Sequence, residues 1–338
     1  MSERLIDGGA AADEPAWERN LRPRGFDELV GQAELLANLR VFVKAALERD
    51  EALDHLLLCG PPGLGKTTVA TLIAKEMGVD LHVTSGPALE RKDLAGIVSH
   101  LKARDVLFID EIHRLNAVVE ENLYPAMEDF KFDLVLGTGP QARTLQMPLP
   151  PFTLVGATTR SGLLTGPMRD RFGFTARFQY YSEAELAEVV VRSAGLLEVA
   201  CARDAAQEIA ARSRGTPRVA NRLLRRVRDF AAVDGDGAID LEVARYALSR
   251  LGIDGRGFDE LDRRLLEHLL VRCGGGPVGL DTLSAALGEE RETLESVVEP
   301  FLLQHGFLAR TPRGRVGTPH AYRQLGLEPP KSLQRDLF

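Results

Sequence analysis

Apolar and polar positions divide the chain into stretches with different periods. From Leu21 to about Tyr181, short apolar runs alternate with segments whose apolar residues recur at helical spacing. The apolar runs are residues 56–59, 81–84, 106–110 and 152–157. Strands that are apolar on both faces are typical of a parallel sheet covered by helices on both sides. We therefore predict an α/β domain over residues 19–181.

The remainder of the chain predicts two smaller domains. Residues 182–252 show helical periodicity throughout, which indicates a small helical domain. The segment 252–257 contains three glycines and predicts a flexible hinge. Residues 1–18, rich in glycine, alanine and acids, predict a disordered N-terminal tail.

The third domain, residues 257–327, has the pattern of a winged helix. Three helical stretches precede two extended runs around the turn Thr311–Gly314, and residues 328–338 follow as a C-terminal tail. The helical stretches are 261–270, 281–287 and 290–303, and the extended runs are 307–310 and 315–318. Helices followed by a hairpin in this order predict a nucleic-acid-binding architecture.

Composition narrows the class of protein. Hydrophobic residues at 44% and charged residues at 27% of 338 positions are typical of a globular chain. Cys59, Cys201 and Cys273 are odd in number and lack metal-ligand spacing, which indicates a reducing compartment. No apolar run approaches the roughly 18 residues of a membrane span, and no leader peptide is recognisable, so we expect a cytoplasmic protein without membrane contact. The net charge of −7 means that any nucleic-acid contact must come from a local basic patch.

The most specific motif is Gly-Pro-Pro-Gly-Leu-Gly-Lys-Thr at residues 60–67. It matches the phosphate-binding loop G-x-x-x-x-G-K-[ST] and lies between a strand-like run and a helical run, as that loop requires. Glycines such as Gly63 and Gly65 let backbone N–H groups turn toward the phosphates. Lys66 is expected to reach the β- and γ-phosphates and the Thr67 hydroxyl to hold Mg²⁺.

Polar residues follow two of the apolar runs at the edge of the sheet where ligands bind. Asp110 and Glu111 end the run 106–110, and there Asp110 would serve Mg²⁺ while Glu111 activates the attacking water. Taken alone, the two acids would equally suit a solvated helix cap. Thr158 and Thr159 end another run, and either hydroxyl could sense the γ-phosphate.

Three arginines are candidates for the nucleotide. Arg169 and Arg171 form either a surface ion-pair cluster or an arginine finger that reaches the ATP of a neighbouring subunit. Arg218 follows Thr216 and Pro217, an expected N-cap and first-turn proline. This cap would fix Arg218 at a helix start, from where it could reach the γ-phosphate.

The winged-helix segment reverses the sign of the charge locally. Residues 300–327 contain no Asp or Glu but include Arg310, Arg313, Arg315 and Arg323. A basic patch in an acidic protein predicts contact with a phosphate backbone. Because no base-reading pattern accompanies it, binding should not depend on sequence. A winged helix that contacts protein is the alternative.

Together these strings resemble the AAA+ ATPases and, within them, the RuvB family of Holliday-junction branch-migration motors. The resemblance covers about Leu21 to Gly326, with long strings at 55–68, 105–115, 123–129, 150–160, 214–230 and 275–317. It implies an ATP-driven homohexameric ring that acts on Holliday-junction or duplex DNA in recombination, repair and the SOS response. It also implies two partners, the junction-binding protein RuvA and the resolvase RuvC.

The resemblance further assigns individual residues. It implies nucleotide contacts at Leu21, Arg22, Gly63, Thr68, Glu128, Asp129, Phe130 and Tyr181. It favours Arg171 over Arg169 as the finger and maps DNA contacts to Arg291, Arg310 and Arg315.

The segment 132–147 separates this family from other AAA+ proteins. Apolar residues alternate on both sides of Gly137–Pro140, which predicts a β-hairpin. Leu134, Leu136 and Leu145 would leave an apolar tip or flank uncovered unless a partner binds there. The hairpin could simply brace the sheet, whereas by resemblance it is the RuvA docking site.

Two other kinds of protein combine a nucleotide domain with a DNA-binding domain. One is a DNA-bound nucleotide switch of the replication-initiator type, and the other is a clamp-loader subunit. The hairpin favours the motor over the switch, and the winged helix counts against the clamp loader.

Overall fold

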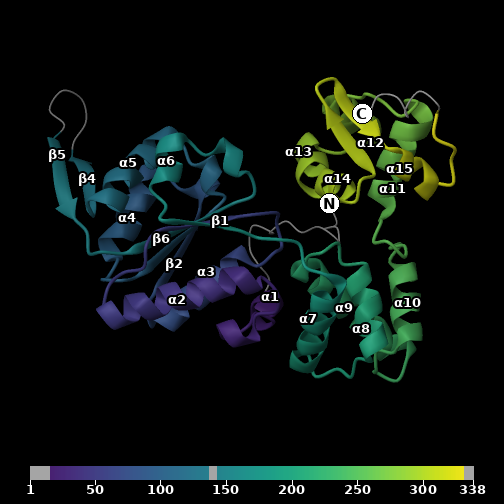
Figure 1. Ribbon diagram of the computed structural model, residues 1–338, viewed down its shortest axis with the longest axis horizontal. Coiled ribbons are helices and arrows are strands. Elements are labelled where there is room, and N and C mark those ends of the chain that lie inside the picture. Colours follow the sequence, from purple (N-terminus) through teal and green to yellow (C-terminus); the bar gives the residue numbers. More distant parts are fainter. Residues whose placement is uncertain (1–15, 137–142, 331–338) are drawn as a thin grey trace. The chain divides into compact units, whose positions relative to one another are not determined.

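The computed structural model describes residues 16–136 and 143–330 (Figure 1). They form two compact units, one spanning Arg19–Tyr181 and the other combining residues 16–18 with residues 182–330. Each unit has its own core and is described separately below.

The first unit is built on a parallel sheet of five strands in the order β2-β3-β6-β1-β7. The strands are β1 (Leu56–Cys59), β2 (Leu81–Ser85), β3 (Val106–Asp110), β6 (Thr153–Thr158) and β7 (Phe174–Arg177). The helices are α2 (Ala33–Arg49), α3 (Lys66–Met77), α4 (Arg91–His100), α5 (Ala117–Glu128) and α6 (Gly166–Asp170). Short 3-10 turns lie at Phe26–Glu28, Gly86–Ala88, Ile112–Arg114 and Ser161–Leu163. The predicted α/β fold with a parallel sheet is confirmed.

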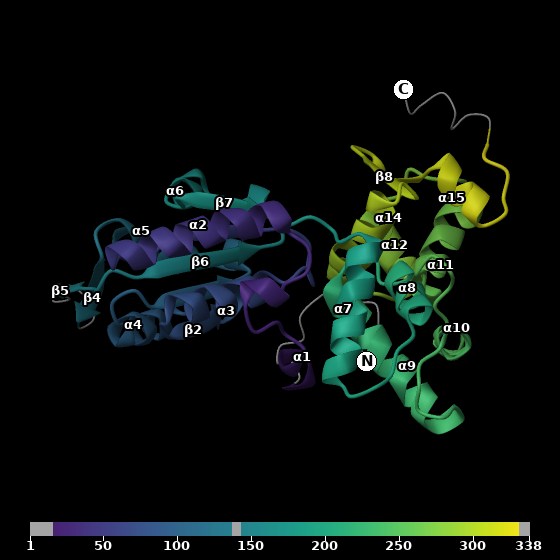
Figure 2. The same cartoon turned by 60° about the horizontal axis from the view of Figure 1, so that its bottom comes forward.

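Burial explains why β1, β3 and β6 were visible as apolar runs. All residues of β1 and β6 are buried, as are the first four of β3, because helices cover both faces of the sheet (Figure 2). On one face, Leu94 of α4 and Leu123 of α5 pack with Leu107 and Leu154 in a single cluster. Strand β7 was not predicted, because this edge strand alternates buried Ala176 with exposed neighbours.

An antiparallel hairpin extends from α5, as predicted. Strands β4 (Lys131–Leu136) and β5 (Arg143–Pro148) pair with Leu134 opposite Leu145, and the turn lies outside the described residues. Leu134 packs against the core of the first unit, whereas Leu145 is 54% exposed. The expectation that Leu134 is an uncovered apolar residue is therefore wrong. Leu145 is exposed, as the same expectation required.

The second unit begins with a helical part. It contains α7 (Glu183–Leu196), α8 (Arg203–Ala211), α9 (Pro217–Asp234) and α10 (Leu241–Arg250). Helix α1 (Ala16–Asn20) corrects the predicted N-terminal tail, because residues 16–18 are ordered in it. The Arg225 guanidinium lies 4.6 Å above the Trp17 ring, which ties this end of α1 to α9. Residues 1–15 lie outside the described part.

The winged-helix part of this unit follows. Its elements are α11 (Glu260–Glu267), the π-helix His268–Arg272, α12 (Leu280–Leu287), α13 (Arg291–Thr293), the π-helix Leu294–Val298, α14 (Glu299–Gln304), β8 (Leu308–Thr311), β9 (Gly314–Gly317) and α15 (Pro319–Gln324). Strands β8 and β9 pair antiparallel and form the wing. The predicted helix 290–303 is thus three successive helical segments. The hydrophobic core of the winged-helix part includes Phe258, Leu266, Leu283 and Phe301.

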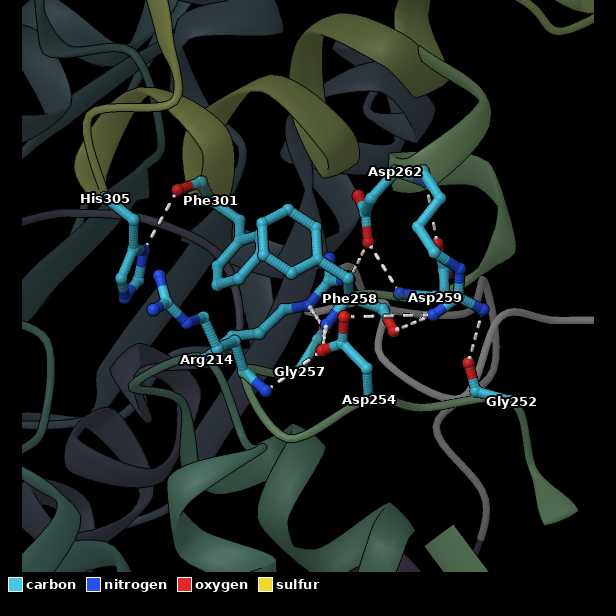
Figure 3. A network of polar contacts seen from close by, with 11 residues as sticks. Arg214, Gly252, Asp254, Gly257, Phe258, Asp259, Asp262, Phe301 and His305 are labelled. Carbon is cyan, nitrogen blue, oxygen red and sulfur yellow. Dashed lines mark hydrogen bonds and ion pairs between the residues drawn. The ribbon is translucent and has the colours of Figure 1, made fainter. Parts of the chain in front are cut away.

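The connection between these two parts is not the flexible hinge that its glycines predicted. Ile253 is 3% exposed, and its carbonyl accepts a hydrogen bond from Arg212 at 3.0 Å. The Asp254 carboxylate accepts the backbone N–H groups of Arg256 and Phe258, both at 2.9 Å (Figure 3). At Gly257, glycine is required by the backbone conformation and by lack of space. Its φ of 82° is left-handed, and a Cβ there would lie 2.8 Å from the Arg212 carbonyl oxygen.

Candidate nucleotide-binding site and nucleic-acid interface

The phosphate loop occupies the turn between β1 and α3. Gly63 and Gly65 have φ angles of 77° and 96°, a left-handed conformation that glycine adopts at little cost. Gly65 is the N-cap of α3, so Thr67 and Thr68 lie in the first turn of that helix. Lys66 is 7% exposed, and its ammonium donates to the Gly60 and Pro61 carbonyls, both at 2.8 Å. The loop thus holds its cation beside a helix N-terminus, an arrangement that favours phosphate.

The two acids lie at the carboxyl end of β3, next to the end of β6. The Asp110 carboxylate accepts the backbone N–H of Glu111 at 2.9 Å. Glu111 has φ 48°, a conformation that costs a non-glycine residue on the order of 1–3 kcal/mol and is frequent at functional sites. Its backbone also packs against Gly86, where a Cβ would lie 2.4 Å from the Glu111 carbonyl oxygen.

Glu111 is the centre of a small polar network. Its Oε2 accepts a hydrogen bond from the Thr159 hydroxyl at 3.2 Å and lies 3.2 Å from Nδ1 of His113. Burial raises the pKa of Glu111, and the neighbouring Asp110 charge adds to this, while Lys66 opposes it. A carboxylate with a raised pKa is suited to accept a proton from water.

The structure distinguishes the two threonines that the sequence left open. Thr158 is fully buried, and its hydroxyl lies 2.9 Å from Nδ1 of His113 and accepts the Arg160 N–H at 3.0 Å. Thr159 is the threonine that reaches Glu111. His113 was not among the predicted site residues, although its place two residues after Glu111 was a usable signal. Burial lowers the pKa of His113, and the Arg160 charge lowers it further.

The structure also positions residues that the resemblance assigned to the nucleotide. The Tyr181 hydroxyl donates to the Leu64 carbonyl at 3.4 Å and lies 3.9 Å from where a Cβ on Gly65 would be. Tyr181 therefore lies against the phosphate loop. Leu21 is buried and Arg22 is partly buried in the same unit.

A second cluster is built on α5 and α6. Arg171 forms an ion pair with Glu128 at 3.0 Å, donates to the Pro167 carbonyl at 2.7 Å and lies 4.2 Å above the Tyr124 ring. Arg169 donates to the Leu164 carbonyl at 3.1 Å, so its guanidinium braces its own turn.

The two residues after Glu128 differ in exposure. Asp129 is exposed, whereas the Phe130 ring packs edge-on against Phe152 with ring centres 6.0 Å apart. Phe130 is therefore part of the core under this cluster, and its expected nucleotide contact is not tested by this packing.

Arg218 belongs to the second unit. Thr216 is the N-cap of α9 as predicted, but its hydroxyl donates to the Ser213 carbonyl at 3.3 Å and does not cap the helix. Arg218 and Arg222 both donate to the Glu18 carboxylate, at 3.2 and 2.9 Å, and Glu18 is buried. The contact of Arg218 with the γ-phosphate stays a prediction.

The wing arginines are less free than the acid-free window suggested. Arg310 and Arg315 come from β8 and β9, and both donate to Glu299, which lies just outside that window and is fully buried. The side chain of Arg310 is 46% exposed and that of Arg315 is 16% exposed. The hydrogen bond to Glu299 raises the pKa of Arg315. Arg291 pairs with Asp281 at 3.0 Å on the surface.

Residues 16–136 and 143–330 contain neither a cluster of metal ligands nor a helix that could span a membrane. No group of three or more His, Cys, Asp or Glu side chains is placed to hold a metal ion there. In the same residues, no helix has the length and apolar character that crossing a bilayer requires.

Family models match almost the whole chain. Residues 21–178 match the Holliday junction DNA helicase RuvB P-loop domain, residues 181–254 the RuvB AAA lid domain, and residues 255–326 the RuvB C-terminal winged helix domain.

Individual relatives agree with these models. The chain is 58% identical over 322 residues to the Holliday junction branch migration complex subunit RuvB of Myxococcus xanthus, covering 95% of this chain and 94% of that protein. The structure of the Thermotoga maritima RuvB Holliday junction branch migration motor aligns with a TM-score of 0.84 at 49% identity, covering 92% of this chain and all of that one. A variant of the same Thermotoga protein aligns with a TM-score of 0.83, again at 49% identity, covering 92% of this chain and 99% of that one.

Proposed function

The chain belongs to the RuvB family of ATP-driven Holliday junction branch migration motors, and we propose how its residues divide the work of that motor. It is an ATPase that binds Holliday-junction DNA and acts in recombination and repair. This membership decides against the nucleotide switch and the clamp-loader subunit.

The first part of the proposal is a catalytic site within one subunit. Thr67 and Asp110 would hold Mg²⁺, which when bound would neutralise charge on the phosphates, and Lys66 would bind the β- and γ-phosphates. Two protein ligands suffice, because Mg²⁺ commonly takes its other ligands from phosphates and water. The hydrogen bond from Thr159 to Glu111 carries the proposal, because it links the candidate γ-phosphate sensor to the candidate base.

The second part is that neighbouring subunits complete the site. Arg171 would act as an arginine finger in a homohexameric ring, and its contacts with Glu128, Pro167 and Tyr124, residues outside the phosphate loop, support a role away from the ATP of its own subunit. Glu128, Asp129 and Phe130 lie beside it in the chain and belong to the same proposed contact.

The third part concerns the remaining nucleotide contacts. Leu21, Arg22, Gly63, Thr68 and Tyr181 bind ATP from the first unit, and Arg218 reaches it from the second. The packing of Tyr181 against the phosphate loop supports this assignment. Arg218 would exchange Glu18 for a phosphate, which offers the same kind of charged acceptor.

The fourth part assigns partners. RuvA docks on the hairpin of β4 and β5, whose Leu145 is an exposed apolar residue, and RuvC joins the same complex. We also propose that the protein is located in the cytoplasm, because it acts on chromosomal DNA.

The hairpin contact can be tested by replacing Leu145 with Ser. We expect loss of RuvA binding in a pull-down, while the ATPase on plain duplex stays normal, because an exposed side chain contributes little to the fold. Leu47→Ser is the matched control, since Leu47 is an exposed leucine on α2. Retained RuvA binding by the Leu145 variant would show that the hairpin only braces the sheet.

The two wing arginines are expected to differ. Arg310 is half exposed, so Arg310→Ala should weaken duplex binding regardless of sequence and lower the slope of log K against log salt by about 1. Arg315 is mostly buried against Glu299, so Arg315→Ala should mainly destabilise the domain, by on the order of 1–3 kcal/mol.

The measurements are titrations of duplex DNA at several salt concentrations and thermal unfolding. Arg49→Ala, on the surface of the first unit, serves as the control. An unchanged salt slope in the Arg310 variant would mean that this arginine does not neutralise a phosphate.

A further inference from the structure

A buried arginine joins the two parts of the second unit. Arg214 lies in the turn between α8 and α9, within the segment that matches the lid model. Its side chain is only 4% exposed, because it extends into the winged-helix segment (Figure 3). An arginine in such surroundings needs partners for its charge.

All the partners that Figure 3 shows for Arg214 belong to the winged-helix segment. Its Nη2 donates to the Asp262 carboxylate, and its Nε donates to the Gly257 carbonyl at 2.9 Å. Its guanidinium also lies 4.2 Å above the ring of Phe301, a core residue of the winged helix. One lid side chain therefore contacts the start of α11, the connector and α14.

Asp262 is equally committed to this contact. It is fully buried, and the oxygen that accepts from Arg214 also accepts the Asp259 N–H at 2.9 Å, which closes the capping box of α11. A contact in the opposite direction accompanies it, because Arg263 of α11 donates to the Gly252 carbonyl at 2.8 Å. Each of the two parts therefore donates an arginine side chain to the other, Arg214 from the lid and Arg263 from the winged helix.

The backbone of Arg214 links this contact to the start of α9. Arg214 has φ 53° and Gly215 has φ 70°, so two successive left-handed residues form the turn. A non-glycine residue keeps such a conformation only where its surroundings fix it. The turn leads within four residues to Arg218, so a displacement of the start of α9 also displaces Arg214.

We propose that Arg214, through Asp262, is the positioning residue that makes the winged helix follow the nucleotide-driven movement of the lid. The inference rests on the proposed role of Arg218 at the γ-phosphate. A displacement of the start of α9 would displace the winged helix with it. The reason is that the Arg214–Asp262 ion pair and the contact of Arg214 with Phe301 join the two parts directly. Without this contact the motor would hydrolyse ATP and hold DNA but transmit little movement between them.

Two substitutions test this proposal. Asp262→Asn keeps the size of the side chain and one acceptor oxygen for the Asp259 N–H, and it removes the charge that Arg214 meets by replacing the other oxygen with an NH2 group. Arg214→Gln shortens the donor and leaves Asp262 without its cation. Arg226→Gln is the control, because Arg226 lies on α9, the helix that follows this turn, and pairs with Asp229 of that helix at 3.0 Å.

The principal measurement is the number of base pairs migrated per ATP hydrolysed, on a four-way junction with RuvA. We expect this ratio to fall at least about fivefold in both variants, a coupling change of the size that conformational linkage carries. ATPase without DNA, and affinity for duplex, should stay within about twofold of the native values. Arg226→Gln should change none of the three quantities. A normal ratio in either folded variant would overturn the proposal.

A distance measurement separates linkage from mere stability. Spin labels at Val233→Cys on α9 and Val271→Cys in the winged-helix part occupy exposed positions, with Cys201 and Cys273 replaced by Ala. We expect a narrow distance distribution in the native background and a broad one in Asp262→Asn. A narrow distribution in Asp262→Asn, whatever its melting temperature, would overturn the proposal as well.

The variant Arg218→Gln distinguishes this inference from the function on which it rests. If Arg218 contacts the γ-phosphate, this variant should change ATP affinity or turnover even without DNA, which Arg214→Gln should not. Normal ATP affinity and turnover in Arg218→Gln would refute the nucleotide role of Arg218. A normal coupling ratio in Arg214→Gln would refute the linkage alone.

Discussion

Glu111→Gln is expected to reduce steady-state ATP hydrolysis by roughly 100-fold or more, while ATP affinity persists. The amide cannot take a proton from water, but it can still accept the hydrogen bond that Thr159 donates to this position at 3.2 Å. The proposed Mg²⁺ ligands, Thr67 and Asp110, are unchanged in this variant. Hydrolysis should be measured under saturating ATP, and affinity with a fluorescent nucleotide.

The same substitution should raise the melting temperature near neutral pH. Burial and Asp110 raise the pKa of Glu111 above its ordinary value of 4.5 in the folded protein, so the folded state binds this proton more readily than the unfolded state does. Above the folded pKa the charged carboxylate therefore opposes folding, and a neutral Gln removes that cost. The gain should shrink as the pH falls toward 4.5, where Glu111 becomes protonated in both states.

Glu121→Gln controls for both measurements, because Glu121 is an exposed acid on α5. Turnover should also fall in the native enzyme as the pH drops through the raised pKa of Glu111, and this acid limb should be absent from the residual activity of Glu111→Gln. Near-normal turnover in Glu111→Gln at any pH would remove Glu111 from the role of base.

The sequence could predict the parallel sheet because three of its five strands are buried on both faces. Strands β1, β3 and β6 read as continuous apolar runs, and the motifs follow directly from their ends. Strand β7 was missed although the other edge strand, β2, was predicted, because its sequence Phe-Thr-Ala-Arg is half polar and ends in an arginine.

What the sequence left open depended on which face a side chain occupies. Thr158 is the last residue of β6 and is fully buried, whereas Thr159 follows the strand and is partly buried, so the two hydroxyls meet different partners although their chemistry is the same. The hairpin gave the same difficulty, because Leu134 and Leu145 are cross-strand neighbours and only one of them is covered by the core.

Charge and glycine content misled for a related reason. Glu299 lies one residue before the acid-free window, yet its buried carboxylate binds both wing arginines. The glycines of the connector predicted a hinge, but a count of glycines contains no information on long-range partners such as Arg212 and Arg214. These contacts join residues some forty positions apart in the chain.

Arg171→Ala is expected to abolish hydrolysis in the assembled ring, by roughly 10³-fold or more, while each subunit still binds ATP. Arg171 lies above the Tyr124 ring and pairs with Glu128, so its planar guanidinium is held in one orientation. Arg169 donates to the Leu164 carbonyl within its own turn, so Arg169→Ala should act mainly through stability. The two variants should therefore differ when turnover is compared with melting temperature.

Mixing experiments decide whether Arg171 acts across an interface. Subunits with Arg171→Ala retain Glu111, and subunits with Glu111→Gln retain Arg171, so either ring alone has no complete site. In rings assembled at random from equal amounts, about a quarter of the interfaces would combine a native Glu111 with a native Arg171. Hydrolysis should then reappear and pass through a maximum near equal mixing. If Arg171 acts only on the ATP of its own subunit, no mixing ratio can restore turnover, because every subunit then lacks either Glu111 or Arg171. Unchanged low activity in confirmed mixed rings would therefore contradict the proposal that Arg171 is an arginine finger.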